Sequence, residues 1–204
     1  MDVVLHRGDL PATVQLGNEI AIDSEAMGLK HDRDRLCLVQ LTDGNGTCHL
    51  VQVAQGQTTA PNLKQVLEDP SKLKIFHFAR FDVALLRHAL GIHCAPIYCT
   101  KIASKLVRTY TDRHGLKELL RELLGIEVSK QEQSSDWGQD KLSEAQIGYA
   151  ARDVEHLHAL KHVLDRMLER ENRRQLAQSC FDFMPNRVAL DLAGWNDVDI
   201  FAHS

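Results

Sequence analysis

Short apolar runs bounded by turn residues occupy the first part of the chain and predict strands. The predicted strands span residues 3–6, 19–23, 36–41 and 48–53. Between the last two runs, residues 42–47 read Thr-Asp-Gly-Asn-Gly-Thr, a composition typical of a tight turn. We therefore expect these two strands to form a hairpin.

From Asn62 onward, helix-like and strand-like segments alternate. Helices are predicted at residues 63–68 and 80–90, and strands at residues 73–78 and 97–99. An early hairpin followed by such alternation is typical of an α/β fold. We expect a mixed sheet with helices on its faces.

The second half of the chain has a mainly helical pattern. Predicted helices span residues 100–109, 116–124 and 143 to about 183. Ser143 and Gln146 predict a capping box at the start of the long helix. Pro185 is expected to end its periodicity and to leave a tail of about residues 185–204. This tail carries large apolar side chains, so we expect it either to pack on its own domain or to form a subunit contact.

Composition narrows the class of protein. A chain of 204 residues without a linker or repeat predicts a single domain over residues 1–204. The start has no leader-like pattern, and no run approaches the roughly 18 apolar residues of a membrane span, so we expect a cytoplasmic protein with no membrane contact. The five cysteines form no C-x-x-C pair that would indicate a zinc or redox site. A net charge of −4 argues against a protein that coats nucleic acid, but it leaves open a small nucleic-acid substrate held through metal ions.

Asp23 and Glu25 stand where the apolar strand 19–23 ends. Residues two apart in a strand share a face, so these carboxylates converge if the strand persists. Two carboxylates on one face repel each other unless a cation joins them, and oxygen ligands suit magnesium or manganese. The same Asp-x-Glu pattern recurs at Asp153, so spacing alone leaves open a simple strand end at the surface.

Two later segments add further candidates. Asp82 is predicted in the first turn of helix 80–90, where a carboxylate interacts favourably with the helix N-terminus. Tyr149 and Asp153 are four residues apart on a predicted helix and therefore share a face. Each feature also has a structural interpretation, as a first-turn helix acid or as a Tyr–Asp hydrogen bond.

The order of these motifs resembles that of the DEDD exonuclease superfamily, in its tyrosine subclass. The three matching motifs are Asp23-x-Glu25, His77-x-Ala79-x-x-Asp82 and Tyr149-x-x-x-Asp153. Segments 131–137 and 149–154 also resemble ribonuclease D, whose additional helical domains we do not expect here. The whole chain, including segments 109–117 and 199–204, resembles the compact nano-RNase C family.

The resemblance implies an RNase H-like fold in which Asp23, Glu25, Asp82 and Asp153 bind two divalent ions, Mg²⁺ or Mn²⁺. It also implies 3′-to-5′ hydrolysis of very short RNA, especially dinucleotides, to mononucleotides, and a ring-shaped homo-octamer. Single-stranded DNA is a further candidate substrate. Tyr149 is implied to hydrogen-bond the attacking water. Because a free phenol has a pKa of about 10, we favour orientation of this water over proton removal.

Several residues are candidates for binding a short nucleic acid. Lys101, Lys105 and Arg108 are spaced to share one face of helix 100–109, which would position phosphates or simply be solvated. Lys101 and Ser104 lie near the start of that helix, where backbone donors favour a terminal phosphate. The remaining candidates for a nucleotide pocket are His114, Gln133, Ser135 and Trp137. Trp137 also suits a core position.

Two other functions remain open. The first is a ribonuclease D-like exonuclease that trims longer RNA or DNA ends. The second is an inactive nucleic-acid-binding scaffold on the same fold. A degenerate scaffold should lack at least one ligand acid, whereas all four acids and Tyr149 stand at motif positions here.

Overall fold

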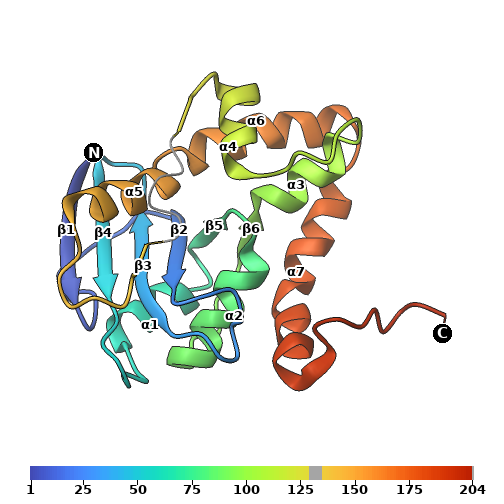
Figure 1. Ribbon diagram of the computed structural model, residues 1–204. Coiled ribbons are helices and arrows are strands. Elements are labelled where there is room, and N and C mark those ends of the chain that lie inside the picture. The colour runs from blue at the N-terminus through green and yellow to red at the C-terminus, as the bar shows by residue number, and fades with distance from the viewer. Residues whose placement is uncertain (129–134, 204) are drawn as a thin grey trace.

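The computed structural model describes residues 1–128 and 135–203, and its centre is one mixed β-sheet (Figure 1). The strands are β1 (Asp2–Arg7), β2 (Glu19–Ala26), β3 (Leu36–Thr42), β4 (Thr47–Gln52), β5 (Leu73–Phe76) and β6 (Ile97–Cys99). Their order across the sheet is β1-β4-β3-β2-β5-β6. The predicted α/β fold with a mixed sheet is confirmed.

Strand β2 lies inside the sheet and has one neighbour of each orientation. It runs antiparallel to β3 and parallel to β5. Strands β3 and β4 form the predicted antiparallel hairpin, while β1 and β6 add parallel edges. Strand β5 ends two residues earlier than predicted, because Phe78 adopts a left-handed φ of 70° and turns the chain into the next helix.

Helices cover the sheet. They are α1 (Pro61–Glu68), α2 (Ala79–Leu90), α3 (Thr100–Val107), α4 (Leu116–Leu119), α5 (Glu144–Glu155), α6 (Leu157–Arg170) and α7 (Arg174–Leu190). Short π-helical turns, Leu120–Leu124 and Asp191–Trp195, follow α4 and α7. Helix α5 packs across β2, β3 and β4, and α7 packs against α2 and β6 (Figure 1). Within the two described stretches, none of the helices has the length and apolar character needed to cross a membrane.

The prediction of one long helix from 143 to about 183 is wrong. The capping box at Ser143 is present, but the helix stops at Glu155, where His156 leaves helical geometry with a ψ of 3°. A second break follows α6, where Asn172 takes a left-handed φ of 54°. Each break redirects the next helix onto a different part of the core, which one straight helix would not reach.

The prediction that Pro185 ends the helical pattern is also wrong, because α7 continues through it to Leu190. An internal proline removes one backbone hydrogen bond and costs about 3 kcal/mol. The neighbouring side chains of Phe181, Met184 and Val188 are buried, and their packing offsets this cost. The segment after the helix therefore begins near residue 191 and not near residue 185.

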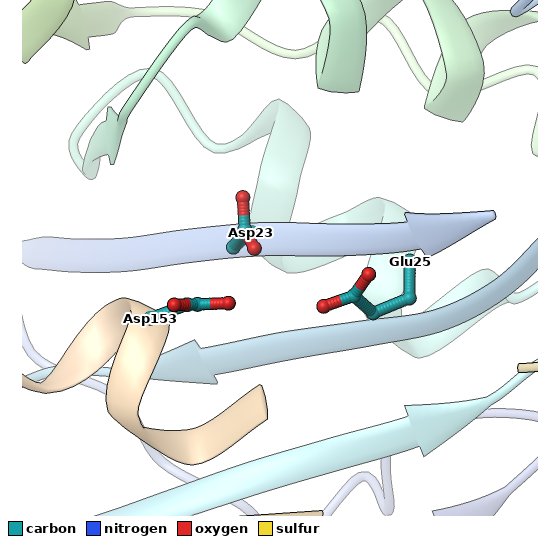
Figure 2. A group of neighbouring side chains, drawn as sticks. All are labelled: Asp23, Glu25 and Asp153. Atoms are coloured by element: carbon teal, nitrogen blue, oxygen red, sulfur yellow. The ribbon is translucent and has the colours of Figure 1, made fainter. Parts of the chain in front are cut away.

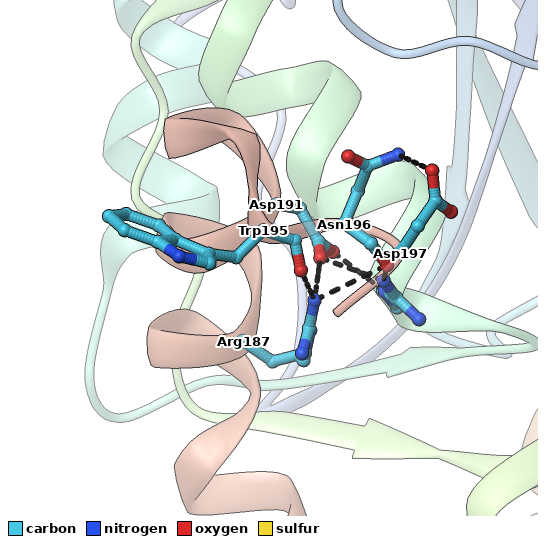
Figure 3. Close-up of polar contacts among 6 residues, drawn as sticks. Arg187, Asp191, Trp195, Asn196 and Asp197 are labelled. Atoms are coloured by element: carbon cyan, nitrogen blue, oxygen red, sulfur yellow. Dashed lines mark hydrogen bonds and ion pairs between the residues drawn. The ribbon is translucent and has the colours of Figure 1, made fainter. Parts of the chain in front are cut away.

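The turn after α7 is tied to the start of α2. Asp191 is 5% exposed and accepts hydrogen bonds from Arg80 Nε and Nη2, both at 2.7 Å. Arg187 also donates to Asp191, and its guanidinium reaches the carbonyl oxygen of Trp195 (Figure 3). Arg80 lies two residues before Asp82, so this cluster holds the helix turn that carries a candidate acid.

Candidate active site

Strand β2 presents two acids on one face. Asp23 and Glu25 alternate with Ser24, whose side chain therefore points to the opposite face. The strand continues to Ala26, so the condition for convergence of the two carboxylates is met.

Helix α5 brings a third acid over β2. One oxygen from each of the Asp23, Glu25 and Asp153 carboxylates lies within 4.8 Å of the others. Figure 2 shows Asp153 reaching from its helix toward the two side chains that project from the strand. The structure thus brings together acids that are about 130 residues apart in sequence.

Asp82 reaches the same cleft from the first turn of α2 and is 2% exposed. The Ser24 hydroxyl donates to Asp82 Oδ1 at 2.6 Å. Asp82 is also close enough to Asp23 for its charge to raise the pKa of the Asp23 carboxyl. The fourth motif acid therefore borders the cluster of three.

Burial and mutual repulsion govern the charge of these acids. Burial, together with the charges of Asp153 and Asp82, raises the pKa of Glu25 to about 9. Burial raises the pKa of Asp82 to about 7 and that of Asp153 to about 7. The pKa of Asp23 also lies well above its usual range, through burial and its three acidic neighbours. Ionising all four of these carboxyls together is therefore costly unless a cation is bound.

Tyr149 stands one helical turn before Asp153 and lines the same cleft. Burial and the charges of Asp153 and Glu25 raise the pKa of its phenol above the ordinary value. The phenol is therefore protonated at neutral pH and is a hydrogen-bond donor. Its ring lies 6.1 Å from the Trp137 ring, which is 2% exposed.

Two clefts meet at the acids. The first has a volume of about 320 Å³ and the second about 560 Å³, and both are lined by Asp23, Tyr149 and Asp153. The first cleft is also bordered by Lys101, Lys117, Phe78 and His77. The second cleft is also bordered by Glu25, Met27, Leu29, Ser135 and Trp137.

His77 is one of the residues that line the first cleft. Its Nδ1 lies 2.9 Å from Thr100 Oγ1, and burial lowers the pKa of the ring to about 3. A neutral imidazole of this kind suits a fixed hydrogen-bond partner better than a proton donor in catalysis.

The predicted basic face of helix 100–109 is only partly present. Lys101 lines the first cleft, with its ammonium 4.1 Å from the Phe78 ring centroid. Arg108 lies beyond the end of α3 and is fully buried, where it pairs with Glu122 and donates to the Arg113 carbonyl oxygen. The expectation that Arg108 shares an accessible face with Lys101 is therefore wrong.

The other substrate-binding candidates are dispersed. Ser104 is fully buried, and its Oγ lies 2.9 Å from His114 Nδ1; neither residue is among those that line the two clefts, although His114 interacts with His77, which lines the first. Ser135 and Trp137 border the second cleft. Gln133 lies outside the described residues.

Some residues around the acids escaped the sequence patterns. Gln40 sits in an apolar run that predicts only a buried strand, although its amide contacts Asp23 and Glu25. The available signal is a glutamine with apolar residues on both sides, Val39 and Leu41. Lys117, Phe78 and Phe81 line the first cleft, but nothing in their local spacing marks them.

The chain matches a family model described as 3′-5′ exonuclease over residues 9–169. It is 36% identical to ribonuclease D of Gluconacetobacter diazotrophicus over 154 residues, which are 76% of this chain and 39% of the relative. The chain thus spans about two fifths of the length of the ribonuclease D sequences it matches.

Solved structures resemble the whole chain. The structure of Brucella melitensis NrnC with bound Mg²⁺ is 53% identical, with a TM-score of 0.94 and 100% coverage of both chains. The structure of the same protein bound to pGG is 54% identical, with a TM-score of 0.95 and the same coverage. The chain therefore belongs to the 3′-5′ exonuclease family, in the compact ribonuclease D-like branch that includes NrnC.

Proposed function

We propose that this protein is a metal-dependent 3′-to-5′ exoribonuclease that hydrolyses very short oligoribonucleotides, especially dinucleotides, to mononucleotides. The observation that carries the proposal is the convergence of Asp23, Glu25 and Asp153 within 4.8 Å at the junction of two clefts. The Mg²⁺-bound and pGG-bound structures of the 53–54% identical NrnC support both the cofactor and the substrate class.

The donor set fits hard divalent cations. Asp23, Glu25, Asp82 and Asp153 offer only carboxylate oxygens, which suit Mg²⁺ or Mn²⁺ better than zinc or copper. Burial and then the charges of neighbouring acids raise the pKa values of these groups, and a bound cation would offset the repulsive part. We assign two ions to these four acids. When bound, such ions would lower the pKa of a water molecule and offset the charge that develops on the leaving 3′ oxygen.

The side chains of the protein hold and orient the reactants. Tyr149 has a protonated phenol beside Asp153, so it donates or accepts a hydrogen bond with the attacking water and does not serve as a strong base. Ser24 holds Asp82 in place from the other face of β2. Trp137 packs near the Tyr149 ring and limits its movement.

The clefts suit a short, phosphate-bearing substrate. Lys101 and Lys117 line the first cleft together with the acids, and their positive charge would attract a phosphate bound there. Phe78 and Phe81 provide apolar surface for a base in the same cleft. Met27 and Leu29 are exposed apolar side chains of the second cleft, which would receive the other nucleotide.

A length series tests this function. RNAs of two to about twenty nucleotides are incubated with Mg²⁺, with Mn²⁺ or with chelator, and kcat/KM is measured for each length. We expect the dinucleotide to be hydrolysed fastest and chelation to stop the reaction reversibly. Faster turnover of the long RNA would favour the ribonuclease D-like alternative, and the same assay on single-stranded DNA tests that substrate. No turnover of any length would support the scaffold alternative.

We also propose a homo-oligomer, an octameric ring by the resemblance to nano-RNase C. Its support in this chain is the exposed apolar surface near the C-terminal end, where Trp195, Val198, Ile200 and Phe201 are all more than two fifths exposed. Light scattering measures the mass directly. A 23.0 kDa particle at micromolar concentration would contradict the oligomer.

A further inference from the structure

Gln40 is a polar residue on a fully buried strand. It lies on β3, whose seven residues are all buried, and its own side chain is 0% exposed. In the antiparallel register Gln40 is directly opposite Asp23, so both side chains project to the same face of the sheet. Helix α5 packs on β2 and β3 and carries Asp153 to this face.

The Gln40 amide joins two of the acids. Its Nε2 donates to Asp23 Oδ2 at 3.1 Å and to Glu25 Oε1 at 3.5 Å. Its Oε1 is buried and has no hydrogen-bond partner in the part of the chain that the structure describes. The two carboxylates are therefore the amide's side-chain partners. If this position served packing alone, Leu or Met would fill the same space without burying an unpaired oxygen such as Gln40 Oε1.

A neutral amide suits this position electrostatically. A lysine or arginine here would also hold the two acids together, but its positive charge would oppose the binding of a divalent ion. Glutamine donates hydrogen bonds without that charge, and it leaves one oxygen on each carboxylate free to bind an ion. Residues that contact metal ligands in this way set the orientation of those ligands.

We propose that Gln40 is a positioning residue that fixes the separation of Asp23 and Glu25 for divalent-ion binding. This inference rests on the proposed function, because it concerns the same acids. It extends that function by assigning part of the ion affinity to a strand that contributes no ligand. Gln40 acts through the two carboxylates and contacts neither water nor substrate in this role.

The test compares Gln40→Met with a control on the same strand. Methionine has a similar length and no donor. Thr42→Val is the control, because Thr42 is also fully buried and loses a hydrogen bond, from its Oγ1 to the Thr47 carbonyl oxygen, away from the acids. Mn²⁺ affinity is measured from the electron paramagnetic resonance signal of free Mn²⁺. We expect Gln40→Met to weaken Mn²⁺ binding by about 10- to 100-fold and Thr42→Val to leave it unchanged.

A second readout separates positioning from general damage. In a metal titration of dinucleotide hydrolysis, the Mn²⁺ concentration for half-maximal rate should rise for Gln40→Met by the same factor as the dissociation constant. The rate at saturating Mn²⁺ should recover most of the wild-type value. If Gln40→Met does not fold, Gln40→Asn carries the same expectation, since its amide is one methylene too short to reach both carboxylates.

The outcomes distinguish the inference from the function beneath it. Wild-type Mn²⁺ affinity in a folded Gln40→Met would overturn the role of Gln40 while the nuclease assignment stands. If the wild-type protein binds Mn²⁺ but hydrolyses no RNA, the proposed function fails, and the affinity ratio still decides the role of Gln40. If the wild-type protein binds no Mn²⁺, both fail.

Discussion

The hydroxyl of Ser24 donates to the Asp82 carboxylate across 2.6 Å and so joins β2 to the first turn of α2. This hydrogen bond favours the ionised form of an acid that is almost completely buried. Ser24→Ala should therefore lower the free energy of unfolding by about 1–2 kcal/mol at pH 8. Urea denaturation in chelator measures this change. Ser179→Ala, whose hydroxyl contacts only a carbonyl within its own exposed helix turn, is the control and should change little.

Replacing a candidate metal ligand should lower the hydrolysis rate and raise the thermal stability of the metal-free protein. Asp153→Asn removes one of three mutually repelling carboxylates, so the metal-free variant should unfold at a higher temperature than the metal-free wild type. Its hydrolysis rate should fall by more than about 100-fold. Mutation of residues that only hydrogen-bond a metal ligand already lowers metal affinity or activity by about 10- to 100-fold. Calorimetry in chelator and a dinucleotide assay measure the two effects. An active Asp153→Asn variant would contradict the assignment of this ligand.

The metal-free protein should lose stability as the pH rises. The pKa values of Glu25, Asp82 and Asp153 are raised in the folded state to about 9, 7 and 7, whereas carboxyls of an unfolded chain titrate near pH 4. Between these limits the folded state binds more protons than the unfolded state, so unfolding becomes more favourable with increasing pH. The stability present below about pH 4 is lost progressively as the pH rises toward 9.

Thermal unfolding from pH 5 to pH 9 in chelator measures this effect, and saturating Mg²⁺ should flatten the decline. The Asp153→Asn variant is the internal comparison and should show a shallower slope. A melting temperature that increases across this range in chelator would refute the interpretation of the acid cluster.

Tyr149→Phe tests whether the phenol orients the water. The ring remains beside Trp137, so folding should be retained, while loss of one well-placed hydrogen bond should reduce kcat by about 100-fold. Mn²⁺ affinity should fall by a smaller factor than kcat, because Tyr149 supplies no ligand oxygen although its phenol hydrogen-bonds Asp153. Equal loss of metal affinity and rate would show instead that Tyr149 supports the ligands.

The ion pair between Arg80 and Asp191 should contribute to global stability. Asp191→Ala leaves Arg80 and Arg187 without their shared carboxylate, and we expect a loss of about 2–3 kcal/mol, reduced by the partial exposure of both arginines. Urea denaturation measures the loss. Asp197→Ala, in the exposed segment nearby, should have a much smaller effect (Figure 3).

Local patterns were sufficient for the sheet and for the motif order. The hairpin of β3 and β4 and the capping box at Ser143 depend on residues within a few positions of each other, so their signals survive in one sequence. The breaks at His156 and Asn172 depend on where α6 and α7 pack, and no glycine or proline marks them. For the same reason, Pro185 looked like a helix end although tertiary packing carries α7 past it.

The residues around the acids were harder to predict from the sequence than the acids themselves. Asp23, Glu25 and Asp153 could be proposed from motif order, whereas the contact between Gln40 and two of them depends on strand register. Arg108 shows the opposite failure, since helical spacing placed it with Lys101 but α3 ends one residue too early. Helical spacing predicts that the Arg108 guanidinium faces solvent, but it is buried and forms an ion pair with Glu122.

The position of α5 has a consequence for synthesis on the ribosome. Among the described residues, all six strands precede α5, yet this helix covers β2, β3 and β4 and supplies Asp153. A nascent chain that has emerged only through β6 therefore carries a sheet with one apolar face uncovered, and it holds Asp23, Glu25 and Asp82 but not Asp153. Completion of the candidate acid cluster coincides with shielding of that face, so an incompletely synthesised chain would have neither the complete cluster nor the shielded face.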